Sequence, residues 1–173
     1  LTAKCLAAQG RLPWRLRRFL RYAADALLLK PFDGEIEFVH RRLVQERAQA
    51  LLHLARRLAP AMVERGAGAI VVTGNTSALR GRANFAGFAP TKAAQRILAE
   101  AMARDLGPKG VHVAYVVIDA VIDLAWTRER YPDRPDSFFI KPASIADEIW
   151  HVLQQDRSAW SFNVEIRPFG ETW

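Results

Sequence analysis

GAIVVTGNTSALRGRANFAGFAPTKAAQRILAEAMARDLGPKGVHVAYVVID, residues Gly68 to Asp119, is the stretch that decides the fold. Two apolar runs, Ala69–Thr73 and Val111–Ile118, lie on either side of a long helical segment. Such runs, without polar alternation, are typical of parallel strands that are covered on both faces. A strand, a helix and a second parallel strand make a right-handed crossover. We therefore expect an α/β fold that binds a ligand at the carboxyl ends of these strands.

Polar side chains gather just after the first predicted strand and at the start of the helix. The loop Gly74–Gly81 holds Asn75, Thr76 and Ser77, and Lys92 follows near the beginning of the helix. Both positions belong to the edge of the sheet where the strands end, which is the usual place for a ligand. The loop and the lysine are therefore the first candidates for a functional site.

The helix that carries Lys92 has clear limits in the sequence. Pro90 suits a first helical turn, so the helix is expected to begin near Ala89, and Gly107 with Pro108 should end it. Helical spacing predicts a buried stripe made of Ile97, Leu98, Ala101, Met102 and Leu106. The same spacing places the polar side chains mostly outside, namely Lys92, Gln95, Arg96, Glu100 and Arg104.

Other elements flank this crossover. An earlier helix is expected over roughly Phe38–Glu64, with Pro60 bending or restarting it. Gly66 and Gly68 should end that helix as cap residues. Further along, the sequence predicts an irregular segment, a third helix and a final alternating strand, which are Asp119–Lys141, Pro142–Gln155 and Ser161–Arg167.

Composition bounds the class of protein. The chain has 173 residues, half of them apolar, which is enough for one domain with a substantial core. A single cysteine, Cys5, excludes an intramolecular disulfide, and no metal-ligand spacing of cysteines and histidines is present. No apolar run approaches the roughly 18 residues that span a bilayer, and no secretory signal is evident. We therefore expect a cytoplasmic protein without a metal site.

The net charge of +7 belongs almost wholly to the amino-terminal arm. Residues 1–30 carry seven Lys or Arg side chains and one acid, Asp25, so the rest of the chain is nearly neutral. Residues 12–29 form an amphipathic basic pattern at helical spacing. That helix can dock on the rest of the protein with a solvated arginine face, lie on a membrane surface, or contact nucleic acid. Nucleic acid is the partner we expect least, because the basic residues do not spread over a folded face.

The quoted segments now point to a family. The succession strand–TGNTSALRG–FAGFAPTK–helix–GPKGVHVAYVVID resembles the carboxyl-terminal half of the short-chain dehydrogenase/reductases. The similarity continues through PASIADEIWHVLQQDRSAWSFNVEIRPFGETW and covers about residues 58–173. It implies a Rossmann-like, three-layer parallel sheet with helices on both faces, whose amino-terminal nucleotide-binding half is missing or replaced. Residues 1–37 would then be a basic arm unlike the family, and residues 38–173 the carboxyl-terminal part of the domain.

The resemblance also implies a reaction and its residues. In the family, a tyrosine four residues before a lysine exchanges a proton with a carbonyl/alcohol pair, and the lysine lowers the pKa of that tyrosine. Here the lysine is Lys92, but the tyrosine position is Phe88, which has no ionisable group. The position of the family's substrate-polarising serine is Asn75, with Thr76 and Ser77 beside it. The catalytic candidates are therefore Lys92, Ser77 and Asn75, in a degenerate active site.

The cofactor implied by the family is NAD or NADP. Lys92 would bond the nicotinamide ribose, and Asp119 and the backbone near Val121 would meet the nicotinamide after the second strand. The family's threonine contact is missing, since Leu124 stands in its place, and no glycine-rich phosphate turn occurs before residue 66. Asp119 and Asp123 form a second candidate, a carboxylate pair at a strand end, for which capping of the loop is the alternative.

Three interpretations stay open at this point. The first is an NAD(P)-dependent carbonyl/alcohol oxidoreductase that acts on a small molecule without the usual tyrosine. The second is a non-catalytic family member that serves as a binding or oligomerisation module, and the third is a fragment. Because the family usually pairs its long helices across a dimer interface, we also expect a homo-oligomer.

Overall fold

The computed structural model describes the backbone of residues 36–83 and 85–171, and side chains from residue 48 onward within those ranges. The described chain divides into two compact units. The larger unit contains the described residues up to Asp119 together with His151–Ile166, and the smaller unit contains Ala120–Trp150 and the described residues after Ile166. The predicted basic helix over residues 12–29 lies outside the described residues.

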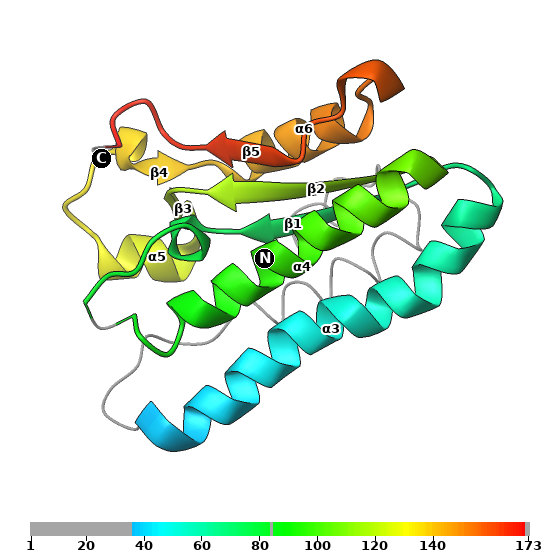
Figure 1. Ribbon diagram of the computed structural model, residues 1–173. Helices are drawn as coiled ribbons and strands as arrows, with labels where there is room; N and C mark the ends of the chain where they lie inside the picture. The colour runs from blue at the N-terminus through cyan, green and yellow to red at the C-terminus, as the bar shows by residue number, and fades with distance from the viewer. Residues whose placement is uncertain (1–35, 84, 172–173) are drawn as a thin grey trace. The chain divides into compact units, whose positions relative to one another are not determined.

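The larger unit is a parallel sheet covered by two long helices. Its strands β1 (Gly68–Gly74), β2 (Val111–Ile118) and β5 (Asn163–Ile166) lie in the order β1-β2-β5. The helices α3 (Ile36–Glu64) and α4 (Ala89–Leu106) lie side by side next to the sheet, as Figure 1 shows. The predicted strand-helix-strand crossover is therefore confirmed, with α4 connecting β1 to β2.

The register of the sheet sets the position of the site. β1 pairs with β2 from Gly68 opposite Val111 to Gly74 opposite Val117, and β2 pairs with β5 as far as Ile118 opposite Ile166. Because all pairs are parallel, the three strands end at the same edge. All eight residues of β2 are buried, as expected for a central strand covered on both faces.

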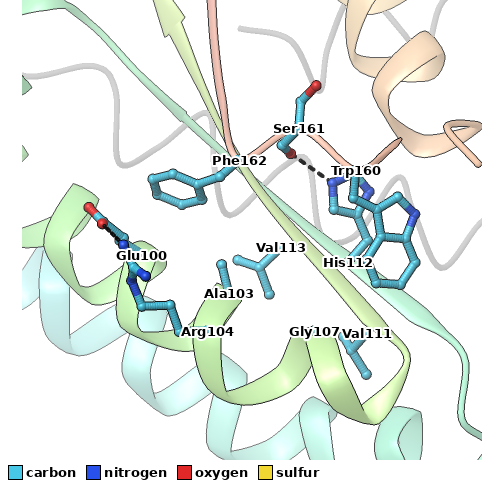
Figure 2. Close-up of a pocket in the computed structure, with 10 residues that line it drawn as sticks. All are labelled: Glu100, Ala103, Arg104, Gly107, Val111, His112, Val113, Trp160, Ser161 and Phe162. Atoms are coloured by element: carbon cyan, nitrogen blue, oxygen red, sulfur yellow. Dashed lines mark hydrogen bonds and ion pairs between the residues drawn. The ribbon is translucent and has the colours of Figure 1, made fainter. Parts of the chain in front are cut away.

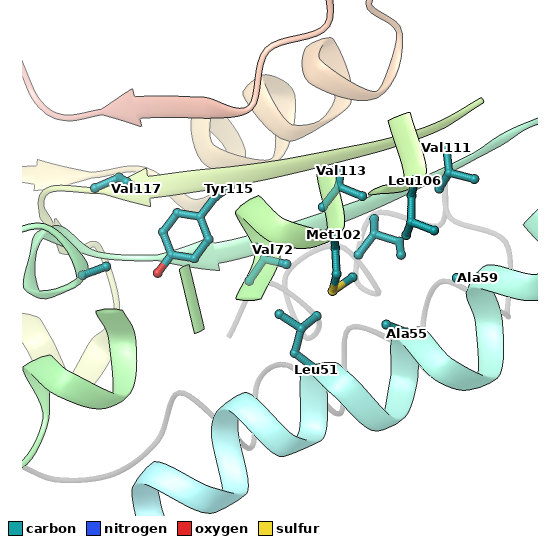
Figure 3. Packing of buried hydrophobic residues seen from close by; sticks show 13 residues of the cluster. Leu51, Ala55, Ala59, Val72, Met102, Leu106, Val111, Val113, Tyr115 and Val117 are labelled. Carbon is teal, nitrogen blue, oxygen red and sulfur yellow. The ribbon is translucent and has the colours of Figure 1, made fainter. Parts of the chain in front are cut away.

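The core fills the space between the sheet and the two helices. Alternate side chains of β2, including Val113 and Tyr115, face Leu51 and Ala55 of α3 and Met102 of α4 (Figure 3). Several of these side chains are fully removed from water, and each fully buried apolar side chain of this size contributes roughly 1.5–3 kcal/mol relative to an exposed one. The sheet and helices thus form a rigid base for the loops at the strand ends.

Two helix predictions needed correction. On α4, Ile97 is 59% exposed and Ala101 is exposed, whereas Lys92, expected outside, is only 3% exposed. The face of α4 that meets the sheet instead carries Lys92 and Ala99 together with Met102 and Leu106. The sequence pattern misplaced the stripe because apolar residues occur on both faces of this helix.

The region between α3 and β1 differs in detail from the prediction. α3 runs through Pro60 to Glu64 as one helix, so Pro60 does not restart it. Gly66 has a positive φ of 60° and ends the helix as predicted, whereas Gly68 is already the first residue of β1. A side chain at position 68 would collide with Met62, so close packing accounts for this glycine.

The smaller unit contains regular structure where an irregular segment was predicted. Two short parallel strands, β3 (Val121–Ile122) and β4 (Phe139–Ile140), flank the helix α5 (Ala125–Arg130). Helix α6 (Pro142–Leu153) begins in this unit and ends in the larger one. Strands of two residues and a helix of six are too short to leave a periodic pattern in the sequence, which is why they were missed.

Arg128 connects several segments of the smaller unit. Arg128 donates to both oxygens of Asp123, at 2.7 and 2.9 Å, and to Asp136 at 2.6 Å. Its guanidinium also lies 4.0 Å above the ring of Phe139. The hydrogen bond from Arg128 lowers the pKa of Asp123 below its ordinary range. None of the described helices combines the length and apolarity needed to cross a membrane.

Candidate functional site

The loop after β1 is shaped by Asn75. Its side-chain oxygen accepts a hydrogen bond from the backbone N–H of Ser77 at 3.1 Å and so caps a short 3-10 turn, Thr76–Ala78. This is the turn-capping role that asparagine commonly plays. The amide N–H₂ of Asn75 is the donor that this side chain can offer to a ligand.

The first turn of α4 is set by Phe88 and Thr91. Pro90 lies in this turn as predicted, and the buried hydroxyl of Thr91 donates to the backbone oxygen of Phe88 at 2.7 Å. The half-buried ring of Phe88 meets Phe85 edge to face, with ring centres 6.1 Å apart. The position where the family has an acidic hydroxyl is therefore occupied by an aromatic ring in a small apolar cluster.

Lys92 is the most unusual side chain in this region. It is one helical turn beyond Phe88, it is 3% exposed, and its Nζ donates to Gln95 Oε1 at 3.2 Å. The interpretation of Lys92 as a solvated lysine is therefore wrong. A lysine is rarely buried to this extent without polar partners, because removing its charge from water is costly. Buried charges of this kind are concentrated at functional sites.

Tyr115 was not among the predicted site residues, although it lies under the same loop. It is fully buried on β2, and its ring packs against Gly74, the residue just before Asn75. Its hydroxyl has no hydrogen-bond partner in the part of the chain that the structure describes. Burial raises the pKa of Tyr115 to about 12, against a smaller lowering by the charge of Arg96. A polar residue within the apolar run of β2 was the only signal in the sequence.

Asp119 closes the other side of the site. Its N–H donates to the backbone oxygen of Ile166 at 2.9 Å, which fixes it at the carboxyl end of β2. Its carboxylate, 13% exposed, lies 4.0 Å from the guanidinium of Arg80 on the loop after β1. Asp123 belongs to the smaller unit, where it is paired with Arg128.

The larger unit thus brings four predicted residues to one edge of the sheet, which are Asn75, Ser77, Lys92 and Asp119. Val121 begins β3 and pairs with Phe139 within the smaller unit. The described residues contain no cluster of three or more His, Cys, Asp or Glu side chains that could hold a metal ion.

Two grooves lie beside α4. One, of about 340 Å³, lies at the site end and includes Ser77, Arg80 and Phe85 in its wall. The other, of about 300 Å³, lies at the opposite end of α4, between Arg104, His112 and Trp160 (Figure 2). Only the first groove contains a predicted site residue.

Known proteins match this chain along most of its length. Residues 35–131 match the family described as short chain dehydrogenase. A crystal structure of a short-chain dehydrogenase from Rhodopseudomonas palustris is 36% identical, with a TM-score of 0.61, over 77% of this chain and 53% of that one. A serine dehydrogenase from Escherichia coli is 19% identical, with a TM-score of 0.65, over 82% of this chain and 58% of that one.

A 4-hydroxyisoleucine dehydrogenase complexed with NADH is also similar in fold, with 20% identity, a TM-score of 0.65, and coverage of 75% of this chain and 58% of that one. The chain therefore spans less than two thirds of the length of the solved structures that it matches. The predicted Rossmann-like α/β fold is confirmed, by the parallel sheet and by these neighbours. From its match over residues 35–131, this chain belongs to the short-chain dehydrogenase family.

Proposed function

We propose that this chain carries the substrate side of an NAD(P)-dependent oxidoreductase that interconverts a carbonyl and an alcohol. The observation that supports this most directly is the burial of Lys92 in the first turns of α4, beside the loop that holds Asn75 and Ser77. Lys92 stands at the family's lysine position, one helical turn after Phe88, and its burial at 3% exposure supports a functional role for this ammonium group.

The residues fit the ribose end of a nicotinamide cofactor. An ammonium group has three N–H donors, and that of Lys92 uses one for Gln95; donors of this kind suit ribose hydroxyls. Asp119 stands at the carboxyl end of β2, near the expected place of the nicotinamide. When bound, the cofactor supplies or accepts the hydride. NAD and NADP are both kept in the proposal, because the solved relatives include one complexed with NADH and one complexed with NADP+.

The proton must come from a group other than Phe88. The N–H₂ of Asn75 and the hydroxyl of Ser77 can each donate a hydrogen bond to a carbonyl oxygen and polarise it. Neither is as acidic as a tyrosine, and a bound water is no more acidic than they are, so in this proposal the proton comes from bound water in a slow step. We therefore expect slow turnover compared with family members that have the tyrosine.

Titration of the 173-residue chain with NADH and NADPH tests the proposal. We expect micromolar binding that Lys92→Ala weakens at least about tenfold, since a charge-assisted hydrogen bond contributes roughly 1.5–3 kcal/mol. Lys109→Ala is the matched control, because Lys109 lies on the surface and its ion pair among the described residues is with Asp105. Absence of binding at millimolar cofactor, or equal binding by Lys92→Ala, would remove the basis for an enzyme.

A second function, a non-catalytic module that self-associates, is favoured by a different observation. Ile97 of α4 and Leu54 and Leu58 of α3 are exposed at 59%, 37% and 40%. Exposed apolar side chains on adjacent long helices are typical of a protein interface. We propose that they pair two copies of the chain, and sedimentation of Ile97→Glu beside Arg104→Glu tests this. A monomeric wild type would contradict it. We also propose that the protein is cytoplasmic. We further propose that residues 1–37 form a basic arm that is unlike the rest of the family.

A further inference from the structure

The groove at the site end of α4 has a chemical character of its own. The residues in its wall include Ser77, the apolar Leu79, Phe85 and Pro90, and two arginines, Arg80 and Arg82. Its volume of about 340 Å³ falls in the range of small-molecule sites. An apolar wall with a few polar groups is the usual composition of a substrate pocket.

The charge of the groove is positive and incompletely balanced. None of the described residues in its wall is acidic. Arg80 has a carboxylate partner at 4.0 Å, Asp119, which offsets much of its charge. Arg82 makes no ion pair within the described part of the chain and is exposed. The groove therefore offers about one positive charge to a ligand.

The position of that charge relative to Ser77 limits the ligand further. Ser77 and Arg82 lie in the wall of the same groove, five residues apart on the loop that follows β1. A ligand that contacts both must carry an anionic group and, at some distance from it, the polar group that meets the serine. Leu79 and Phe85 would contact the apolar part between the two groups.

We propose that the substrate is a monoanionic oxo or hydroxy carboxylic acid with an apolar body, held by Arg82 through its carboxylate and presented to Ser77 through its carbonyl or hydroxyl. This inference rests on the proposed oxidoreductase function and names its substrate class. A carboxylate suits arginine because the planar guanidinium can form two parallel hydrogen bonds with it. A single carboxylate matches the one charge that Asp119 leaves unbalanced.

Calorimetric titration of the chain with matched acids and esters tests the proposal. The probes are 4-oxopentanoate and 4-oxo-4-phenylbutanoate, each beside its methyl ester, with and without saturating NADH or NADPH. We expect at least one acid to bind about fivefold or more tightly than its ester, in line with the strength of a charge-assisted pair at a partly exposed site. Arg82→Gln should remove that preference, and Arg82→Lys should restore part of it. Arg104→Gln, at the other groove, should leave it intact.

The outcomes separate this inference from the proposed function. Cofactor binding together with equal affinity for every acid and its ester overturns the substrate class and leaves the oxidoreductase proposal standing. A preference for acids that Arg82→Gln does not change also overturns it, since the charge would then lie elsewhere. The titration with cofactor alone, without any acid, tests the proposed function. If the wild type does not bind cofactor there, the proposed oxidoreductase function fails.

Discussion

The two ends of α4 differ in how completely their polar groups are matched. At its carboxyl-terminal end, Arg104 pairs with Glu100 at 2.9 Å and Lys109 pairs with Asp105 at 2.8 Å. At its amino-terminal end, by contrast, Tyr115 has a buried hydroxyl without a partner among the described residues, and Arg82 has no ion pair there. Both ends border a groove of similar volume, so the difference lies in chemistry and not in size.

In the groove at the carboxyl-terminal end of α4, one ring nitrogen of His112 and the indole nitrogen of Trp160 have hydrogen-bond partners. His112 stacks on Trp160 with ring centres 4.8 Å apart, and its Nε2 lies 2.8 Å from the backbone oxygen of Ser161 (Figure 2). A carbonyl oxygen only accepts, so that nitrogen must carry the hydrogen. The indole N–H of Trp160 is used as well, by the backbone oxygen of Gln155 at 3.2 Å. Polar groups that are already paired with one another have little to offer a ligand, which favours the proposed site at the other end of α4.

The largest expected effect comes from filling the space beneath the site loop. In Gly74→Val, the new side chain would collide with the Tyr115 ring, and overpacking of this kind costs about 3 kcal/mol. Urea unfolding followed by circular dichroism measures the loss. Gly87→Ala is the control, because the space around Gly87 is open. Equal midpoints for wild type and Gly74→Val would mean that the loop does not pack on Tyr115.

The next effect concerns the unpartnered hydroxyl directly. Tyr115→Phe keeps the ring against Gly74 and removes a buried polar group, so we expect a gain of about 1 kcal/mol in the free energy of unfolding. Tyr131→Phe serves as a control on the other described tyrosine. A loss of stability in Tyr115→Phe would show that the hydroxyl is hydrogen-bonded in solution.

Titration with base sharpens the same point. The pKa of Tyr115 is raised from 10 to about 12 in the folded protein, so its contribution to stability is complete below pH 10 and is lost as the pH rises through 12. The midpoint temperature of thermal unfolding should therefore decrease more steeply between pH 9 and 12 for the wild type than for Tyr115→Phe. Parallel curves for the two proteins would contradict the burial of this phenol.

The sequence predicted the elements of the crossover because each has its own local signal. Val111–Ile118 is an uninterrupted apolar run and was predicted with its correct limits, and Pro90 marked the first turn of α4. Asn75 and Lys92 were chosen from spacing within the family pattern, and the structure places both at the predicted edge of the sheet. Neighbouring residues in sequence carried all of this information.

What escaped prediction depends on contacts between distant residues. Lys92 is buried because it lies on the face of α4 that packs against the rest of the unit. The sequence did not identify that face, because the opposite face also carries an apolar residue, Ile97. Tyr115 meets Gly74 across two strands, some forty residues apart in sequence. Arg128 holds the smaller unit through Asp136 and Phe139, which no local periodicity connects.

The smallest expected effect is at the matched end of α4. Glu100 accepts from Arg104, and that hydrogen bond lowers the pKa of Glu100 from its ordinary value of 4.5. Its stabilising contribution is therefore present above that pH and is lost as the pH falls through the lowered pKa. In Glu100→Gln, the free energy of unfolding should decrease slightly less than in the wild type as the pH falls below 5. The difference is small because exposed ion pairs contribute little. The same variant should bind NADH and the probe acids as the wild type does. A clear loss of ligand binding in Glu100→Gln would show that the two ends of α4 are coupled, and the assignment of function to one end would then fail.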